Sequence, residues 1–427
     1  MIHDAIVVGA GLSGLVCTRR LADAGANVLV LDARDRVGGR LLNGRLAETI
    51  VDLGGQWMSV GQPRLAALAS ALGVASYPQQ RSGRAIGDGD AQGVFAGLAT
   101  AIATWRAVRR IERIRRSSPE AELDARSLGA WLEATIRNPT ARARIALHAE
   151  LVFATDPDDL SLLNYLATLE ATGGFRPRGP DLPGGGREHR FVGGAQSLAL
   201  ALAGGLGSRI VLDQAVLAIE RDGAALRVRT LRGSYVARRV VLAIPPALAA
   251  RVDVVLSASS RRFAGASRSG RVVKCFAAYD RAFWRDDGWS GEAYLQRGNV
   301  RATVELVPPD GGAPCLLAFV VGAPAAAWSV RDPEDRRREL VATLVQQFGD
   351  HAGSPIDYAE IDWGTEQWSA GCVASLGPGV LTSGATWREP HEQIHIAGTE
   401  SAVAWPGYME GAIEAGERAA DEILILK

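Results

Sequence analysis

The chain has 427 residues, of which 47% are hydrophobic, so it is long enough for two domains with substantial cores. The 47 basic and 47 acidic residues cancel, which gives no electrostatic reason to expect nucleic acid or an anionic membrane as a partner. Four widely spaced cysteines indicate neither a disulfide framework nor a zinc site, and we expect no metal. Without a leader-like segment, a bilayer-length apolar run or a tail anchor, the sequence favours a cytoplasmic protein.

The first element is a short apolar strand at residues 5–8 that runs directly into a GxGxxG motif. Gly9 suits the tight turn, Gly11 lets the backbone approach a pyrophosphate, and Gly14 lets the next helix pack closely on the strand. That helix, at residues 12–24, begins with Leu12 and Ser13, and its N-terminus favours negative charge. The pattern therefore predicts a phosphate site.

A second strand at residues 27–31 ends at Asp32, whose carboxylate can accept both ribose hydroxyls of a dinucleotide. Ala33 and Arg34 follow directly, and we expect them to line the same nucleotide. Gly39 and Arg40 then resemble the GGR segment of the flavoproteins with two dinucleotide-binding domains, in which the arginine helps to hold the FAD pyrophosphate. This resemblance favours FAD over NAD.

A further strand within residues 48–57 leads to a second glycine pair, where Gly55, Gln56 and Trp57 are expected beside the cofactor because glycine lets backbone lie against a flat ring. After a helix at residues 63–72 the pattern becomes helical, with segments at 97–116, 128–136 and 140–153. The arginine-rich face of the first segment is expected to be solvated. Residues 175–189 are rich in proline and glycine, which predicts a linking loop.

The chain then returns to the cofactor. FVGG at residues 191–194 precedes a helix, and strands are expected at residues 210–219, which include the cofactor contact Val216, and at 226–230 and 235–244. A second insertion has strands at 271–279, 300–307 and 315–321 and an amphipathic helix at 332–348.

The last segment supplies a strand within residues 393–400 and a helix within residues 405–416, with Pro406 near its first turn. Gly398, Glu400 and Met409 are expected at the cofactor, and the helix N-terminus is expected to face the flavin ring, where negative charge gathers on reduction.

Taken together, the chain resembles a flavin-containing amine oxidase of the monoamine oxidase family. The motifs GxGxxG, GGR, DLGGQW, FVGG, AIPP, AGTE and GYMEGAIEAGERAA occur in the family's order. The resemblance implies an α/β fold with α+β insertions: a Rossmann-like FAD domain with two dinucleotide-binding elements and a discontinuous substrate domain. We expect residues 1–75, 190–255 and 365–427 in the FAD domain, and residues 76–189 and 256–364 in the substrate domain.

Three side chains acquire roles through the resemblance. Lys274, one of only two lysines, matches the lysine that holds a water against flavin N5 and assists the reaction with O2. Cys372 matches the position where some members tether FAD through a thioether, although SAGC here departs from the family's SGGC. Tyr408 matches one wall of an aromatic sandwich, whose second wall here is Val373, so that Trp405 or Trp368 substitutes or the substrate is bulkier.

The implied reaction is oxidation of an amine to an imine by hydride transfer to flavin N5, followed by hydrolysis to an aldehyde or ketone, with O2 reduced to H2O2. One alternative is an L-amino-acid oxidase, which needs an arginine for the substrate carboxylate. Others are a flavin-dependent desaturase or dehydrogenase with another electron acceptor, and a protein in which FAD is purely structural. Family members are often homodimers, which we also expect here.

Overall fold

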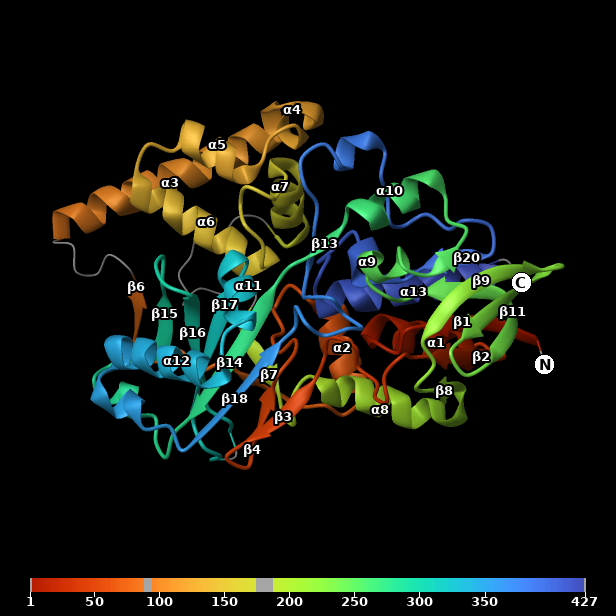
Figure 1. Cartoon of the computed structure of the whole chain (residues 1–427), viewed down its shortest axis with the longest axis horizontal. Helices are drawn as coiled ribbons and strands as arrows, with labels where there is room; N and C mark the ends of the chain where they lie inside the picture. The colour runs from red at the N-terminus through yellow and green to blue at the C-terminus, as the bar shows by residue number, and fades with distance from the viewer. Residues whose placement is uncertain (1, 88–93, 174–186, 310, 426–427) are drawn as a thin grey trace.

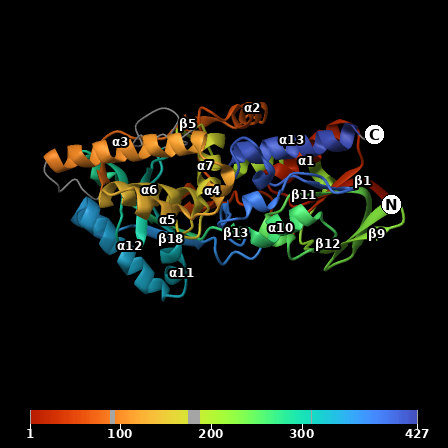
Figure 2. The same ribbon diagram turned by 90° about the horizontal axis from the view of Figure 1, so that it is seen from above.

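The computed structural model describes residues 2–87, 94–173, 187–309 and 311–425 (Figure 1). Two views at right angles show an elongated chain with a sheet and its helices at one end and a second sheet beneath a group of helices at the other (Figure 2). Both drawn chain ends lie at the end that holds β1. No helix among the described residues has the length and apolar character needed to cross a bilayer.

The first sheet has the order β12-β9-β10-β11-β1-β2-β8, with β20 pairing to β11. β1 runs parallel to both β2 and β11, and its residues face alternate cores: Val7 packs with one cluster and Ile6 with the other. This explains the uninterrupted apolar run, because a parallel sheet is covered on both faces. The strands are β1 (Ile2–Val8), β2 (Val28–Leu31), β8 (Ile210–Val211), β9 (Val216–Asp222), β10 (Ala225–Thr230), β11 (Ser234–Leu242), β12 (Asp253–Val254) and β20 (Ile394–Ile396).

Helices cover both faces of this sheet. The helices α1 and α13 lie side by side, and a Cβ added to Gly416 would meet the Ser13 carbonyl at 2.3 Å, so only glycine permits this approach. The helices on this side are α1 (Leu12–Asp23), α2 (Pro63–Ala71), α8 (Gln196–Leu206) and α13 (Met409–Ile425); α9 (Pro246–Ala249) and α10 (Ala258–Ala266) pack against the other core.

Two sequence-based predictions for this region are wrong in detail. The strand expected at residues 210–219 is divided into β8 and β9, because Asp213 has a φ of +55° and its N–H donates to the Arg34 carbonyl (2.8 Å) instead of continuing a ladder. The last helix begins at Met409 rather than near Pro406, because Trp405 (φ +54°) and Gly407 (φ +85°) are left-handed and cannot belong to a right-handed helix.

The second sheet has the order β18-β14-β17-β16-β15-β6. Its strands are β6 (Arg84–Gly87), β14 (Val272–Ala278), β15 (Trp289–Tyr294), β16 (Val300–Leu306), β17 (Cys315–Val321) and β18 (Asp357–Asp362), with α11 (Ala323–Ser329) and α12 (Pro333–Phe348) beside them. Figure 1 shows a helical group beyond one end of this sheet: α3 (Val94–Ser117), α4 (Glu120–Asp124), α5 (Leu128–Thr135), α6 (Pro139–Phe153) and α7 (Leu162–Ala171).

Several short elements were not predicted from the sequence, although the second strand of a hairpin, at Thr49–Asp52, is the strand expected within residues 48–57. β3 (Asn43–Leu46) and β4 (Thr49–Asp52) form a hairpin, and β5 (Ser76–Pro78) pairs with β7 (His189–Phe191) across the helical insertion. The minor pair β13 (Arg268–Ser269) and β19 (Ala374–Ser375) joins the second insertion to the C-terminal segment. Most of the predicted loop at residues 175–189 lies outside the described residues.

Candidate active site

The glycine motif forms a tight turn between β1 and α1. Gly9 has a φ of +105°, and a Cβ there would meet the Ala243 carbonyl at 2.8 Å. A Cβ on Gly14 would lie 1.9 Å from the Gly9 carbonyl oxygen, whereas one on Gly11 would face only Gly39 at 3.9 Å. The turn therefore requires Gly9 and Gly14 for packing, while Gly11 leaves room in front of the helix, as expected for a pyrophosphate.

Asp32 lies directly beside this turn. Its carboxylate accepts the Ala10 N–H (2.6 Å) and the Arg34 N–H (2.9 Å), and burial raises its pKa while these hydrogen bonds oppose the shift. The Arg34 guanidinium pairs with Glu366 and donates to Ser369 Oγ (2.7 Å). The cofactor contacts of Ala33 and Arg34 stay a prediction.

Arg40 joins the N-terminal and C-terminal segments. Its Nη1 donates to the Glu400 carboxylate (2.7 Å) and to the Cys372 carbonyl oxygen (2.7 Å). Burial raises the pKa of the Cys372 thiol, and the positive charges of Arg40 and Lys274 oppose that shift. Four side chains predicted from separate motifs are therefore neighbours in the structure.

Lys274 extends from the middle of β14 into the interior and is 4% exposed. Its Nζ donates to the Asp52 carbonyl (2.5 Å), the Gly54 carbonyl (2.9 Å) and Gln56 Oε1 (2.6 Å). Burial lowers its pKa to about 7, and the Asp52 carboxylate, itself bound by Arg190 (2.8 Å), opposes the shift. The ammonium is thus anchored on the glycine pair of the DLGGQW motif.

The predicted aromatic wall is next to this centre. The rings of Tyr408 and Trp405 meet edge to face, with centroids 5.2 Å apart and planes at 85°. Val373 lies close to the same loop, since a Cβ on Gly407 would be 2.9 Å from its side chain. Trp405 therefore does not form a parallel second wall, and no contact places Trp368 there among the described residues.

Several buried polar atoms around this centre have no hydrogen-bond partner among the described residues: Ser13 Oγ, Gln56 Nε2 and Glu400 Oε2. Ser13 lies in the first turn of α1, whose N-cap Gly11 supplies no side-chain acceptor. Unsatisfied donors at a helix N-terminus suit phosphate oxygens, and an amide and a carboxylate suit the polar edge of a flavin. The residues present fit a bound FAD.

The other predicted cofactor residues are more peripheral. Val216 lies at the start of β9 and packs partly into the sheet core, near Gln214, whose N–H donates to the Asp32 carbonyl (2.7 Å). Leu12 is buried at the start of α1, Met409 is half-buried against the α1 core, and Gly398 is buried beside Glu400. Gly55 is exposed, and its N–H donates to the Arg40 carbonyl (3.1 Å).

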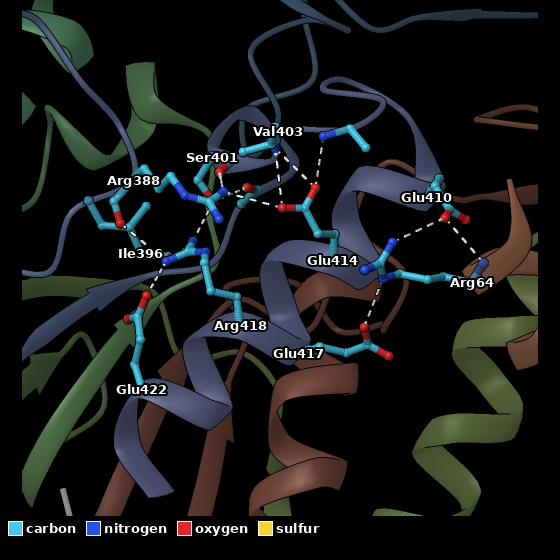
Figure 3. Close-up of polar contacts among 12 residues, drawn as sticks. Arg64, Arg388, Ile396, Ser401, Val403, Glu410, Glu414, Glu417, Arg418 and Glu422 are labelled. Carbon is cyan, nitrogen blue, oxygen red and sulfur yellow. Dashed lines mark hydrogen bonds and ion pairs between the residues drawn. The ribbon is translucent and has the colours of Figure 1, made fainter. Parts of the chain in front are cut away.

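Two carboxylates of α13 bind neighbouring segments: Glu414 contacts the loop before the helix and Glu410 contacts the start of α2 (Figure 3). Glu414 accepts the Val403 N–H (3.0 Å) and the Ala404 N–H (2.9 Å), and Glu410 accepts the N–H groups of Arg64 (3.1 Å) and Leu65 (2.8 Å) at the start of α2. Glu410 is only 1% exposed. An acid at a helix N-terminus is stabilised by the free N–H groups, so α13 and α2 are fixed together here.

One charged residue in this region was missed from the sequence. Arg187 belongs to the predicted linking loop, yet its guanidinium lies over the Trp57 ring, 4.9 Å from the centroid. The one sequence signal for this position is that Arg187 comes two residues before β7, where the chain runs back to the site.

Comparison with known proteins also points to a bound flavin. A family model described as flavin containing amine oxidoreductase matches residues 12–424. A Mycobacterium tuberculosis protein whose name assigns it to the flavin-containing monoamine oxidases is 37% identical, over 99% of this chain and 97% of its own length. Equus caballus flavin-containing amine oxidase A is 32% identical over 99% of this chain and 85% of its own.

Solved structures of amine oxidases superpose on the whole chain. Cyclohexylamine oxidase from Brevibacterium oxydans superposes with a TM-score of 0.90 at 26% identity, covering 100% of this chain and 99% of that one. Wild-type putrescine oxidase bound to putrescine superposes with a TM-score of 0.92 at 27% identity and the same coverage.

Proposed function

We propose the following residue roles from the premise that the chain belongs to the flavin-containing amine oxidoreductase family, whose members named above oxidise amines with a flavin. The protein is an FAD-dependent amine oxidase, with a small-molecule amine and O2 as its reactants. When bound, FAD would accept two electrons from the amine and pass them to O2. The binding and catalytic roles of this chain's own residues are proposed below.

At the nucleotide end, the free N–H groups of α1 and Ser13 Oγ would hold the pyrophosphate, and Asp32 would accept the ribose hydroxyls. Arg40 would supply positive charge near the phosphates while its pair with Glu400 keeps it oriented. We propose residues 1–75, 190–255 and 365–427 as the FAD domain, since Arg40 contacts Glu400 and the Gln214 N–H donates to the Asp32 carbonyl.

Lys274 is the proposed catalytic cation. The observation that carries this role is a buried ammonium fixed by three acceptors on the DLGGQW segment. Its three hydrogen bonds keep Nζ immobile, and its low-dielectric surroundings strengthen any interaction with negative charge that develops nearby. We propose that it stabilises the anion formed as O2 is reduced.

At the substrate end, Tyr408 would form one wall beside the amine, and Trp57, over which Arg187 lies, would line the same end. Apolar and aromatic surroundings penalise an ammonium, so the substrate would react as the neutral amine. The position of Val373 beside Gly407 leaves one side of Tyr408 without a second ring, which favours a substrate broader than a flat aromatic amine.

Cys372 is the proposed attachment point if FAD is tethered. Of the four cysteines it is the one that is not fully buried; burial raises the pKa of its thiol, and the charges of Arg40 and Lys274 oppose that shift. Acid precipitation tests this, because a thioether keeps the yellow colour in the pellet and non-covalent FAD leaves it in the supernatant. The homodimer stays a prediction that sedimentation of the loaded protein would test.

The reaction is tested by quantifying products in air. An amine oxidase forms carbonyl product and H2O2 in equal amounts. Oxidation of a hydrophobic substrate without peroxide, with turnover only when a quinone is added, would instead support the dehydrogenase alternative.

A further inference from the structure

Arg187 is held in place from both its backbone and its side chain. Arg81 donates to its carbonyl oxygen (2.7 Å), and β7 begins two residues later, paired with the end of β5. The guanidinium lies over Trp57 and donates from Nη1 toward the Tyr294 hydroxyl (3.5 Å). Trp57 in turn contacts Phe319, whose ring lies 5.8 Å from Lys274 Nζ. A chain of contacts therefore joins Arg187 to the catalytic lysine.

The charge of Arg187 also reaches the proposed substrate wall. Burial raises the pKa of Tyr408, and the guanidinium opposes that shift. Burial lowers the pKa of His148 to about 4, and the same guanidinium adds to that shift. Side chains from β15, α6 and the loop before α13 thus surround this one cation.

No carboxylate of the described residues forms an ion pair with Arg187, which sets it apart from other inward-pointing arginines. Arg34, Arg40 and Arg190 are each paired with an acid. The neighbouring Glu188 accepts the Val60 N–H (3.2 Å) instead. A cation among aromatic rings has lost part of its hydration, so binding an anion stabilises it. A carboxylate fits best, because the planar guanidinium can donate two parallel hydrogen bonds to its two oxygens.

We propose that Arg187 binds a carboxylate of the substrate, so that the preferred substrate is an amine that also carries a carboxylate. This inference rests on the proposed function and names its substrate class. The same charge would disfavour diamines, since their second ammonium would approach the guanidinium.

The test compares matched compounds with the FAD-loaded protein. 2-Phenylethylamine against phenylalanine probes a carboxylate on the reacting carbon, and pentylamine against 5-aminopentanoate probes a distant one; cadaverine is the dication. We expect Arg187→Met to lower kcat/KM for the preferred carboxylated compound roughly 100-fold, the loss of a charge-assisted pair. Its neutral counterpart should change by less than about threefold, below the effect of one neutral hydrogen bond.

Arg84→Met is the matched control, because Arg84 also lies over a tryptophan, Trp289, at 4.4 Å but on the exposed side of β6. It should leave the ratio of carboxylated to neutral substrate unchanged. Calorimetric titration with benzoate gives a readout independent of turnover, and Arg187→Met should weaken binding while Arg84→Met should not.

Equal losses for carboxylated and neutral ligands, or no loss with any ligand, would overturn the role of Arg187. Failure of every amine to be oxidised would refute the proposed function instead, and the benzoate titration would still decide whether Arg187 binds a carboxylate.

Discussion

The two ends of the candidate site are built in different ways. The nucleotide end consists of backbone turns in which single glycines touch neighbouring carbonyls, as Gly14 does with Gly9. The proposed substrate end consists of side chains such as Trp57, Arg187 and Tyr408, which come from distant parts of the chain and lie near one another only in the fold.

Because of this difference, the two ends should tolerate different amino-acid substitutions. A backbone turn has no free volume, so one added methyl group disrupts both cofactor and fold. A wall of side chains can change its chemistry while the backbone persists, so substitutions there should alter which substrate reacts. Loss of FAD should therefore follow changes at the first end, and altered specificity should follow changes at the second.

The largest effect is expected for Gly14→Ala. Its Cβ would lie 1.9 Å from the Gly9 carbonyl, so the variant should lose bound FAD and about 3 kcal/mol of the free energy of unfolding. Urea unfolding and flavin content measure this. Gly204→Ala in α8 is the control: nothing lies within 4 Å of its added Cβ, and the protein should be unchanged or more stable by up to about 1 kcal/mol. A Gly14→Ala protein that retains FAD would refute the difference between the two ends.

Lys274→Met should slow reoxidation of the reduced protein by O2 roughly 100-fold, the usual cost of removing one preorganised charge or donor. The reason is that the buried ammonium is fixed by three acceptors and faces the centre of the site. Stopped-flow mixing of reduced enzyme with O2 measures the rate, and equilibrium dialysis measures FAD affinity. Unchanged oxygen reactivity with weakened FAD binding would make Lys274 a structural residue.

Glu410→Gln tests the scaffold that joins α13 to α2. The substitution removes the buried charge of Glu410 and one of the two carboxylate oxygens that accept N–H groups at the α2 N-terminus. The free energy of unfolding should therefore fall by about 1–2 kcal/mol. Glu417→Gln, which removes an exposed pair with Arg64 (3.1 Å), should cost less than about 0.5 kcal/mol. Both variants should keep the wild-type substrate ratio. Equal destabilisation by the two would show that the Glu410 contacts contribute little.

A separate prediction is a pH dependence of the stability of the cofactor-free protein. Burial lowers the pKa of Lys274 from 10.5 to about 7, so between these values the unfolded chain binds a proton that the folded chain does not. Stability from this group therefore rises with pH across that window. The difference in unfolding free energy between wild type and Lys274→Met should move in favour of wild type from pH 7 to pH 10. A difference independent of pH would contradict the shift.

The sequence predicted the nucleotide end well because its signals are local. The order of strand, glycine turn, helix and Asp32 is fixed by backbone sterics within one short stretch, and β1, α1 and β2 appear where expected. The roles expected of Lys274 and Cys372 came from the resemblance, and the structure places Cys372 near Arg40 and Lys274.

The substrate end could not be read in the same way. Arg187 lies in a loop rich in proline and glycine, and among 45 arginines its sequence context does not distinguish it from a solvated one. The orientation of Arg34 toward Glu366 and the start of the last helix at Met409 depend on tertiary contacts, such as the N–H groups that Glu414 accepts. Such contacts join residues far apart in the chain and leave no local pattern.

Anaerobic titration of the FAD-loaded protein tests the central claim most directly. An equimolar amount of a reactive amine should bleach the flavin, and admission of O2 should restore the colour with an equimolar yield of H2O2. A protein that takes up no FAD, or whose flavin no amine, polyamine or amino acid bleaches, would contradict the account.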